Sequence, residues 1–399
     1  MTVHQASQAA GDRWLKSLLG VLLLAYIAAT ALGWTRGLDE GLHVEAAGHA
    51  VAGENAAADH AALGQPAAAH RPTPFWLVLP FVFLLGAIAV LPLLEPAAHW
   101  WESNLHKFYV AANLAALTLL GIAVGHPGGS VARATATLAH TLVVEYVPFI
   151  VLLFSLYTIS GGIRIAADLP AHPATNAALI ATGGLLASFV GTTGAAMLLV
   201  RPLVETNRQR RHVAHTIVFF IFIVCNCGGL LTPLGDPPLF LGYLAGVEFW
   251  FPLRLWKSWL LINGLLLAVY WAWDRFHAYP REAARDLAAD ESRVRSLRFA
   301  GLWPNGPLLV GIVLSVALLD PGQPVPGTDW HPWFYLREAV QLALVLVSLV
   351  AGSHHVRRSN AFDYVAIIEV AVLFIGIFIS MQPALEILKQ RGGQLALDS

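Results

Sequence analysis

Apolar stretches of about 20 residues recur along the whole sequence, and this feature restricts the fold more than any other. An α-helix rises about 1.5 Å per residue and the hydrocarbon core of a bilayer is about 30 Å thick, so each stretch can cross a membrane. Only 12% of the 399 residues are charged and 57% are hydrophobic, which is too apolar for a soluble protein. We therefore predict an all-α polytopic membrane protein. Nine stretches meet the length requirement: 14–34, 74–93, 107–124, 138–160, 213–249, 256–273, 301–319, 334–350 and 362–381.

The charge balance and the motif content exclude several classes of function. The net charge is −1, from 24 basic and 25 acidic residues, so nothing favours a nucleic-acid partner. The sequence contains no phosphate-binding loop motif, so nothing in it supports ATP-driven transport. The spans contain neither a nucleophile beside a base nor metal-ligand spacing, so we expect no enzyme and no bound cofactor. Cys225 and Cys227 are too close in sequence for an unstrained disulfide, and we expect inert buried thiols.

Basic residues in short loops mark the cytoplasmic side, and here they favour a re-entrant segment over a tenth span. The stretch 177–200 is apolar but contains four glycines. If it crossed the membrane, the arginine cluster at 201–211 would lie outside. A hairpin that enters from the cytoplasm and returns keeps this cluster inside, together with a cytoplasmic linker at 275–300.

Residues 1–34 form either a first transmembrane helix or a secretory signal, because basic residues precede a short apolar run. We expect residues 35–73, which are rich in Ala and His, to be an external linker. Four histidines there could bind a transition metal, but their irregular spacing and the lack of a nearby Cys favour a linker. These histidines are His43, His49, His60 and His70.

Two stretches at membrane depth cannot form regular helix. One is Gly-Thr-Thr-Gly at 191–194, and the other is 226–238, where three prolines and three glycines interrupt the long segment 213–249. Non-helical backbone in a membrane must be buried or line a cavity, and a broken helix offers carbonyl oxygens to ions. The alternative is that Gly and Pro only kink packed helices. The candidate ion or substrate ligands are Thr192, Thr193, Asn226, Thr232 and Asp236, with Thr192, Thr193 and Asp236 as sodium ligands.

Glu145 and Glu369 lie inside predicted spans, where a charge costs about 2.5 to 3.5 kcal/mol on insertion scales. A buried carboxyl can exchange a proton near neutral pH, so both are candidates for proton coupling. The alternative for each is a carboxyl hydrogen-bonded between helices. Each follows a β-branched pair in the third span after 74 or 301, with opposite predicted orientation, which indicates an inverted repeat.

These motifs resemble the ion transporter superfamily, which includes NhaD-type sodium/proton antiporters, citrate carriers and arsenite carriers. The closest likeness is to the NhaD-type and citrate-carrier branch, and it extends from about Phe75 to Leu385. The longest and most specific match is Leu-Thr-Pro-Leu-Gly-Asp-Pro-Pro-Leu-Phe-Leu-Gly at 231–242. Shorter matches lie at 96–102, 145–149, 159–163 and 191–195.

The resemblance implies two inverted repeats, each with three helices, a re-entrant hairpin, a broken helix and a closing helix. The first would be 74–274, with its hairpin at 177–200 and its broken helix at 213–249 holding sodium and contacting the substrate. The second would be 301–399. Its hairpin, broken helix and closing helix are absent, so we expect this repeat to be incomplete. A truncated chain and a second polypeptide are the two explanations, and a homodimer is a further expectation from the resemblance.

The first functional hypothesis is secondary sodium/proton antiport in a bacterial-type inner membrane, by alternating access about Thr192 and Asp236. The alternative within transport is cation-coupled uptake of citrate or another carboxylate. Little fixed positive charge at membrane depth argues against an anion, although helix N-termini and a bound cation could supply it. A third hypothesis is an inactive, truncated membrane protein. The expected partners are sodium, protons or citrate, and the lipid bilayer.

Overall fold

The computed structural model describes Gly20, Leu24 and residues 73–397, except 126–128, 284, 287–289, 291–294, 323 and 326. Apart from Gly20, Leu24 and Thr73, the predicted first helix at 1–34 and the linker at 35–73 lie outside the described residues, as do the four linker histidines. Packing divides the chain into two units. We call Val151–Phe362 the central unit, and residues 73–150 with 363–397 the flanking unit.

Six helical segments of the described chain are long and apolar enough to cross a membrane, and a seventh is a helix pair bent by 45°. The predicted class, an all-α polytopic membrane protein, is confirmed. Two predicted spans, 301–319 and 334–350, form helices of only 17 and 16 residues. The long segments are Phe75–Leu93, Asn104–Val124, Val131–Ser160, Pro173–Val190, Ala214–Leu231 and Phe251–Arg281, and the bent pair is Val365–Ser380 with Gln382–Arg391.

Many large apolar side chains are exposed on the described part of the chain, and several charged side chains are buried. Leu261 and Trp303 are 72% and 81% exposed, whereas Arg210 and Arg337 are 5% and 4% exposed. Charged side chains are rarely buried in soluble proteins unless they are paired. An apolar exterior over buried ion pairs is what a lipid environment requires.

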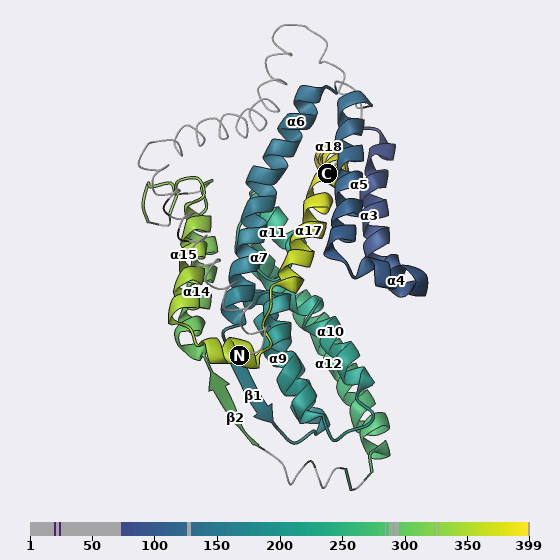
Figure 1. The fold of residues 1–399 in the computed structure, drawn as a ribbon, viewed down its shortest axis with the longest axis vertical. Coiled ribbons are helices and arrows are strands. Elements are labelled where there is room, and N and C mark those ends of the chain that lie inside the picture. The colour runs from purple at the N-terminus through teal and green to yellow at the C-terminus, as the bar shows by residue number, and fades with distance from the viewer. Residues whose placement is uncertain are drawn as a thin grey trace. The chain divides into compact units, whose positions relative to one another are not determined.

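In the flanking unit, α17 (Val365–Ser380) packs along α5 (Asn104–Val124) (Figure 1). Gly376 permits this approach, because a Cβ atom there would lie 2.7 Å from the Cβ of Ala111. The other elements are η1 (Phe75–Val78), α3 (Leu79–Val90), η2 (Leu91–Leu93), α4 (Glu95–Trp101), α6 (Val131–His140), the π-helical η3 (Thr141–Tyr146) and α18 (Gln382–Leu397).

In the central unit, α8 (Pro173–Val190) and α9 (Thr192–Thr206) form a helical pair. This pair packs against the interrupted segment 214–244 and against α12 (Trp256–Trp273). α7 (Val147–Ser160) begins in the flanking unit and ends in the central unit. The remaining helices are α10 (Ala214–Ile223), η4 (Cys227–Leu231), α11 (Pro237–Leu244), η5 (Phe251–Leu255), η6 (Asp274–Ala278), η7 (Tyr279–Arg281), α14 (Leu302–Leu318), α15 (Leu336–Ala351) and α16 (His354–Ser359).

A two-stranded antiparallel sheet forms from two segments for which the sequence predicts loops. β1 (Arg164–Asp168) pairs with β2 (Arg295–Ala300), with Arg164 opposite Ala300 and Asp168 opposite Arg295 (Figure 1). Each strand connects two helices, and pairing satisfies backbone groups that would otherwise need water or side chains. Five to six residues without clear alternation carry too weak a signal for the sequence alone to reveal this pairing.

Candidate functional site

The helices α8 and α9 form an antiparallel hairpin with a single residue at its tip. Gly191 is that residue, and its φ of +77° is a conformation that side chains disfavour. At the open end, the Asn176 and Asn207 amides donate to each other's oxygens, both at 2.7 Å. The hairpin therefore begins and ends on the same side, which is the geometry that a re-entrant segment needs. Its entry into the membrane from the cytoplasm stays a prediction.

The interrupted segment follows the hairpin in sequence. α10 ends at Ile223, a short 3-10 turn follows, and α11 begins only at Pro237. Glycines allow two close backbone contacts here, one between the two sides of the break and one between the break and α8. A Cβ atom at Gly229 would lie 2.7 Å from the Gly235 carbonyl oxygen, and one at Gly228 would lie 2.6 Å from the Cα of Gly184 in α8. Only glycine allows the backbone to pack this tightly here.

The hairpin tip is bonded to this break. The Thr192 N–H donates to the Gly235 carbonyl at 3.4 Å. Ser188 makes the other links: its hydroxyl donates to the Gly228 carbonyl at 2.5 Å and accepts from the Leu231 N–H at 3.2 Å. The Thr232 hydroxyl donates to the Ser188 carbonyl. These bonds satisfy backbone groups that the broken helix leaves open.

The predicted ligands fall into two groups. Thr192, Thr232 and Asp236 come together where the tip meets the break, although Thr232 is buried and already bonded. Thr193 and Asn226 are exposed, and the Asn226 amide donates to the Ile221 carbonyl at 2.8 Å. Ser188 is not among the predicted ligands, because its only signal in the sequence is a lone hydroxyl in an apolar run three residues before Gly191.

Asp236 is the acidic residue of this site. It is half-buried at the N-cap of α11, and its side chain makes no cap hydrogen bond. Among the described residues, no hydrogen bond or ion pair engages its carboxylate. Helix N-termini usually offer N–H donors to an anion, but Pro237 and Pro238 remove two of them. The carboxylate is therefore available for a hard cation, which oxygen ligands suit.

Transition-metal chemistry has a different requirement. Within the described part of the chain, no group of three or more His, Cys, Asp or Glu side chains could hold a metal ion. The oxygen ligands at the tip and the break are of the kind that suits a hard cation rather than zinc or copper.

The acids predicted for proton coupling, Glu145 and Glu369, lie in the flanking unit and have partners there. Lys107 Nζ lies 2.7 Å from the Glu369 carboxylate, with the lysine side chain only 6% exposed. The Gln382 amide donates to Glu145 at 2.8 Å, and His140 Nδ1 lies 3.8 Å from that carboxylate. Glu145 sits in a π-helical turn, a feature common at functional sites. Proton coupling by either acid stays a prediction.

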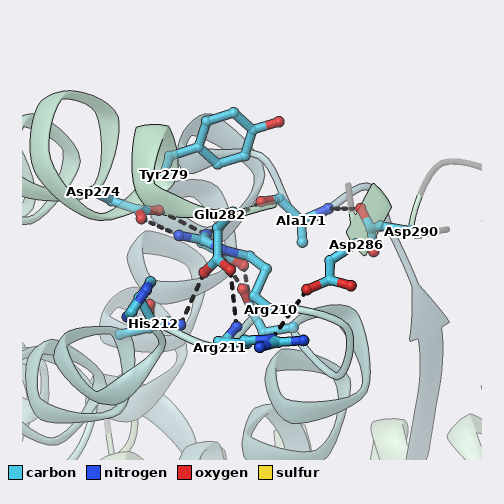
Figure 2. Close-up of polar contacts among 12 residues, drawn as sticks. Ala171, Arg210, Arg211, His212, Asp274, Tyr279, Glu282, Asp286 and Asp290 are labelled. Atoms are coloured by element: carbon cyan, nitrogen blue, oxygen red, sulfur yellow. Dashed lines mark hydrogen bonds and ion pairs between the residues drawn. The ribbon is translucent and has the colours of Figure 1, made fainter. Parts of the chain in front are cut away.

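A charge cluster ties the open end of the hairpin to the end of α12 (Figure 2). Arg210 follows α9; its guanidinium pairs with Asp274 and donates to the Ala171 carbonyl at 3.2 Å. Glu282 lies 3.4 Å from Arg210 Nε and accepts from the Arg211 and His212 N–H groups at 3.0 and 2.9 Å. In the sequence, these arginines indicate only which side of the membrane is cytoplasmic.

The electrostatics of Glu282 follow from these contacts. Burial opposes its ionisation, but the two backbone hydrogen bonds and the Arg210 charge outweigh burial and lower the pKa of its carboxyl. Glu282 is therefore held as a carboxylate that fixes the loop after α9. We call Arg210, Asp274 and Glu282 the hairpin clamp, because they hold the hairpin base in place.

One comparison with known proteins gives a match. A family model described as "putative citrate transport" covers residues 70–397. No curated protein and no solved structure matches the chain. The matched range includes the hairpin, the break and both units, so it takes in every described element of the candidate site. The chain therefore belongs to this family of transport proteins.

Proposed function

We propose that the protein is a secondary carrier that moves citrate, or a related carboxylate, across the membrane together with a coupling cation. Sodium is the first choice of cation. The proposal rests on one observation in particular: the Asp236 carboxylate, beside the junction of the hairpin tip and the break, has no partner in the part of the chain that the structure describes.

An unpaired carboxylate at membrane depth is unfavourable unless a cation or a proton joins it. Backbone carbonyls of the break and the Thr192 hydroxyl are oxygen donors of the kind that replace the water shell of a hard cation. A cation bound here would also offset the charge of a substrate anion. That pairing gives a physical reason why cation and carboxylate would move together.

The substrate class comes from the family, whose description names citrate transport. Sodium/proton antiport is the second candidate, because an unpaired Asp236 could also bind sodium and protons in turn without any anion. A bacterial-type inner membrane stays the expected location, since both activities need an ion gradient to act on.

The test is transport by the purified full-length chain in lipid vesicles. Uptake of radiolabelled citrate is measured with an inward sodium gradient and with choline in its place, beside sodium-driven proton flux from a pH-sensitive dye. Asp236→Asn removes the charge, and Asp329→Asn is the matched control, because Asp329 is an exposed carboxylate in a loop.

We expect sodium-dependent citrate accumulation in the wild type and in Asp329→Asn. Asp236→Asn should lower it at least tenfold, since losing a bond to a charged group costs about 1.5 to 3 kcal/mol. If proton flux requires sodium and Asp236 and no citrate is taken up, the citrate proposal is wrong and sodium/proton antiport is supported instead. Citrate uptake that is indifferent to sodium and to Asp236→Asn would overturn the coupling, and absence of both fluxes would overturn both candidates.

A further inference from the structure

A second polar cluster lies in the central unit, at the start of α15. Arg337 and Glu338 are 4% and 5% exposed. Arg337 Nε and one terminal nitrogen both contact a single oxygen, Oε1 of Glu338, at 2.8 and 2.7 Å. Among the described residues, the other terminal nitrogen donates only to the Tyr243 hydroxyl, at 3.3 Å. A guanidinium has five N–H donors, so donors remain for another oxygen acceptor.

Two aromatic side chains of α11 orient the Arg337 guanidinium. Its central carbon lies 5.8 Å from the centre of the Phe240 ring and 5.5 Å from that of Tyr243. The Tyr243 hydroxyl donates to the Val316 carbonyl at 2.7 Å, which fixes this ring in turn. Arginine stacked on aromatic rings keeps its planar edge in one orientation, and that edge matches a carboxylate.

The same half-helix begins at the cation candidate. The Phe240 N–H donates to the Asp236 carbonyl at 3.2 Å, so Phe240 lies one turn from Asp236. Tyr243 lies seven residues beyond Asp236, or about 10 Å along the helix axis. α11 therefore connects the Asp236 carboxylate at its start with the ion-paired Arg337 guanidinium, which its aromatic rings contact near its end.

The buried amide of Gln341 supports a ligand site here independently of the Arg337 contacts. It lies one turn along α15 from Arg337, on the same face, and is fully buried. Among the described residues neither its amide nitrogen nor its amide oxygen has a hydrogen-bond partner. A buried polar group without a partner costs about 1 to 3 kcal/mol, and a leucine or methionine would fill the same space without that cost. An acceptor that joins the amide nitrogen from outside the chain would lower this penalty.

We infer that Arg337, Tyr243 and Gln341 form a binding site for a carboxylate group of the transported substrate. The Arg337 edge and the Gln341 amide donate to the carboxylate oxygens, and the Phe240 and Tyr243 rings keep the guanidinium in place. Because Glu338 already neutralises Arg337, the charge of the substrate is offset by the cation at Asp236. The inference rests on the proposed function and adds the residues that recognise the anion.

The experiment measures citrate binding directly, by isothermal titration with the full-length chain in lipid nanodiscs and sodium chloride. Gln341→Met is the decisive variant, because it removes the amide and keeps the volume. Leu349→Met is the matched control, since Leu349 is fully buried two turns further along the same face of α15. Arg337→Lys keeps the charge but loses the planar fork.

Gln341→Met should weaken citrate binding about tenfold, the effect of one lost hydrogen bond to a charged group. Its melting temperature should equal or exceed that of the wild type, because an unpaired amide is gone. Arg337→Lys should weaken binding further, and Leu349→Met should bind as the wild type does. Unchanged citrate affinity in Gln341→Met would overturn the inference, whatever the behaviour of Arg337→Lys.

The titration also separates this inference from the proposed function. If the wild type binds citrate through these residues but vesicles show no citrate uptake, the carboxylate site holds and the carrier function fails. If vesicles accumulate citrate and both variants bind it normally, the carrier function holds and the site is wrong. Absence of citrate binding in the wild type would overturn the site.

Discussion

Lys107 supplies the charge that keeps Glu369 compatible with an apolar helix pair. Their 2.7 Å contact joins α5 to α17, and the lysine is almost fully buried. The position of Glu369 within an apolar run marks it in the sequence as a candidate for proton coupling. The sequence does not show that Lys107 is its partner. Lys107 looks like a snorkelling residue at the start of a span, and only the tertiary packing of α5 on α17 brings the two charges together.

The first prediction concerns this pair. Lys107→Met should lower the melting temperature, because it removes the buried partner of Glu369, whose side chain is 41% exposed, and leaves that carboxylate unpaired on an apolar helix. The double variant Lys107→Met with Glu369→Leu should recover most of the loss, since an apolar pair needs no compensation. The measurement is thermal unfolding of each purified variant in the same detergent. Losses that simply add in the double variant would show that the two charges do not stabilise each other.

At the scale of elements, the contact between the hairpin tip and the break positions the site. The sequence located both interruptions, because clusters of Gly and Pro within an apolar run prevent a continuous helix. It could not show that Ser188 bonds both sides of the break, since a serine in an apolar helix usually bonds its own backbone. The sequence also could not show that the Thr232 hydroxyl already donates to the Ser188 carbonyl, whereas the Asp236 carboxylate has no partner among the described residues.

The second prediction tests the tight packing at the break. Gly229→Ala should lower both the melting temperature and citrate transport, because its Cβ atom would lie 2.7 Å from the Gly235 carbonyl and 2.9 Å from the Thr192 methyl group. Gly264→Ala is the control. Gly264 lies within α12 with open space around it, so alanine there should be neutral or stabilise the helix by up to about 1 kcal/mol. Equal behaviour of the two variants would contradict the described packing.

The third prediction concerns the hairpin clamp and pH. The pKa of Glu282 is lower in the folded chain than its ordinary value of 4.5, so its ionisation stabilises the fold above that value. This contribution disappears as the pH falls through the lowered pKa. Thermal unfolding between about pH 7 and pH 3 should therefore show a steeper acid loss in the wild type than in Glu282→Gln.

Glu248→Gln is the control for that pH series, because Glu248 is an exposed acid that forms an ion pair at 3.4 Å with Arg254, which is also exposed. Exposed pairs contribute little to stability, so this variant should follow the wild type. A wild-type curve that coincides with that of Glu282→Gln at low pH would show that the clamp does not depend on a charged Glu282.

At the scale of the whole molecule, the packing units and the predicted repeats divide the chain differently. The predicted repeats, 74–274 and 301–399, follow sequence pattern and orientation, whereas the units place 363–397 with 73–150. Periodicity cannot foresee such an exchange, because it depends on which helices pack, as α17 does on α5. The repeat boundaries and the homodimer stay predictions. The membrane class followed from sequence directly, because hydropathy alone carries it.

The central claim is that a cation binds at Asp236 and is coupled to a carboxylate substrate. Equilibrium binding of radioactive sodium to the purified full-length chain in nanodiscs tests it most directly, with and without citrate. Linkage requires that citrate raise sodium affinity if sodium raises citrate affinity. We predict saturable sodium binding that citrate strengthens in the wild type and in Asp329→Asn, and that Asp236→Asn abolishes. Sodium binding that is equal in the wild type and in Asp236→Asn would contradict the claim.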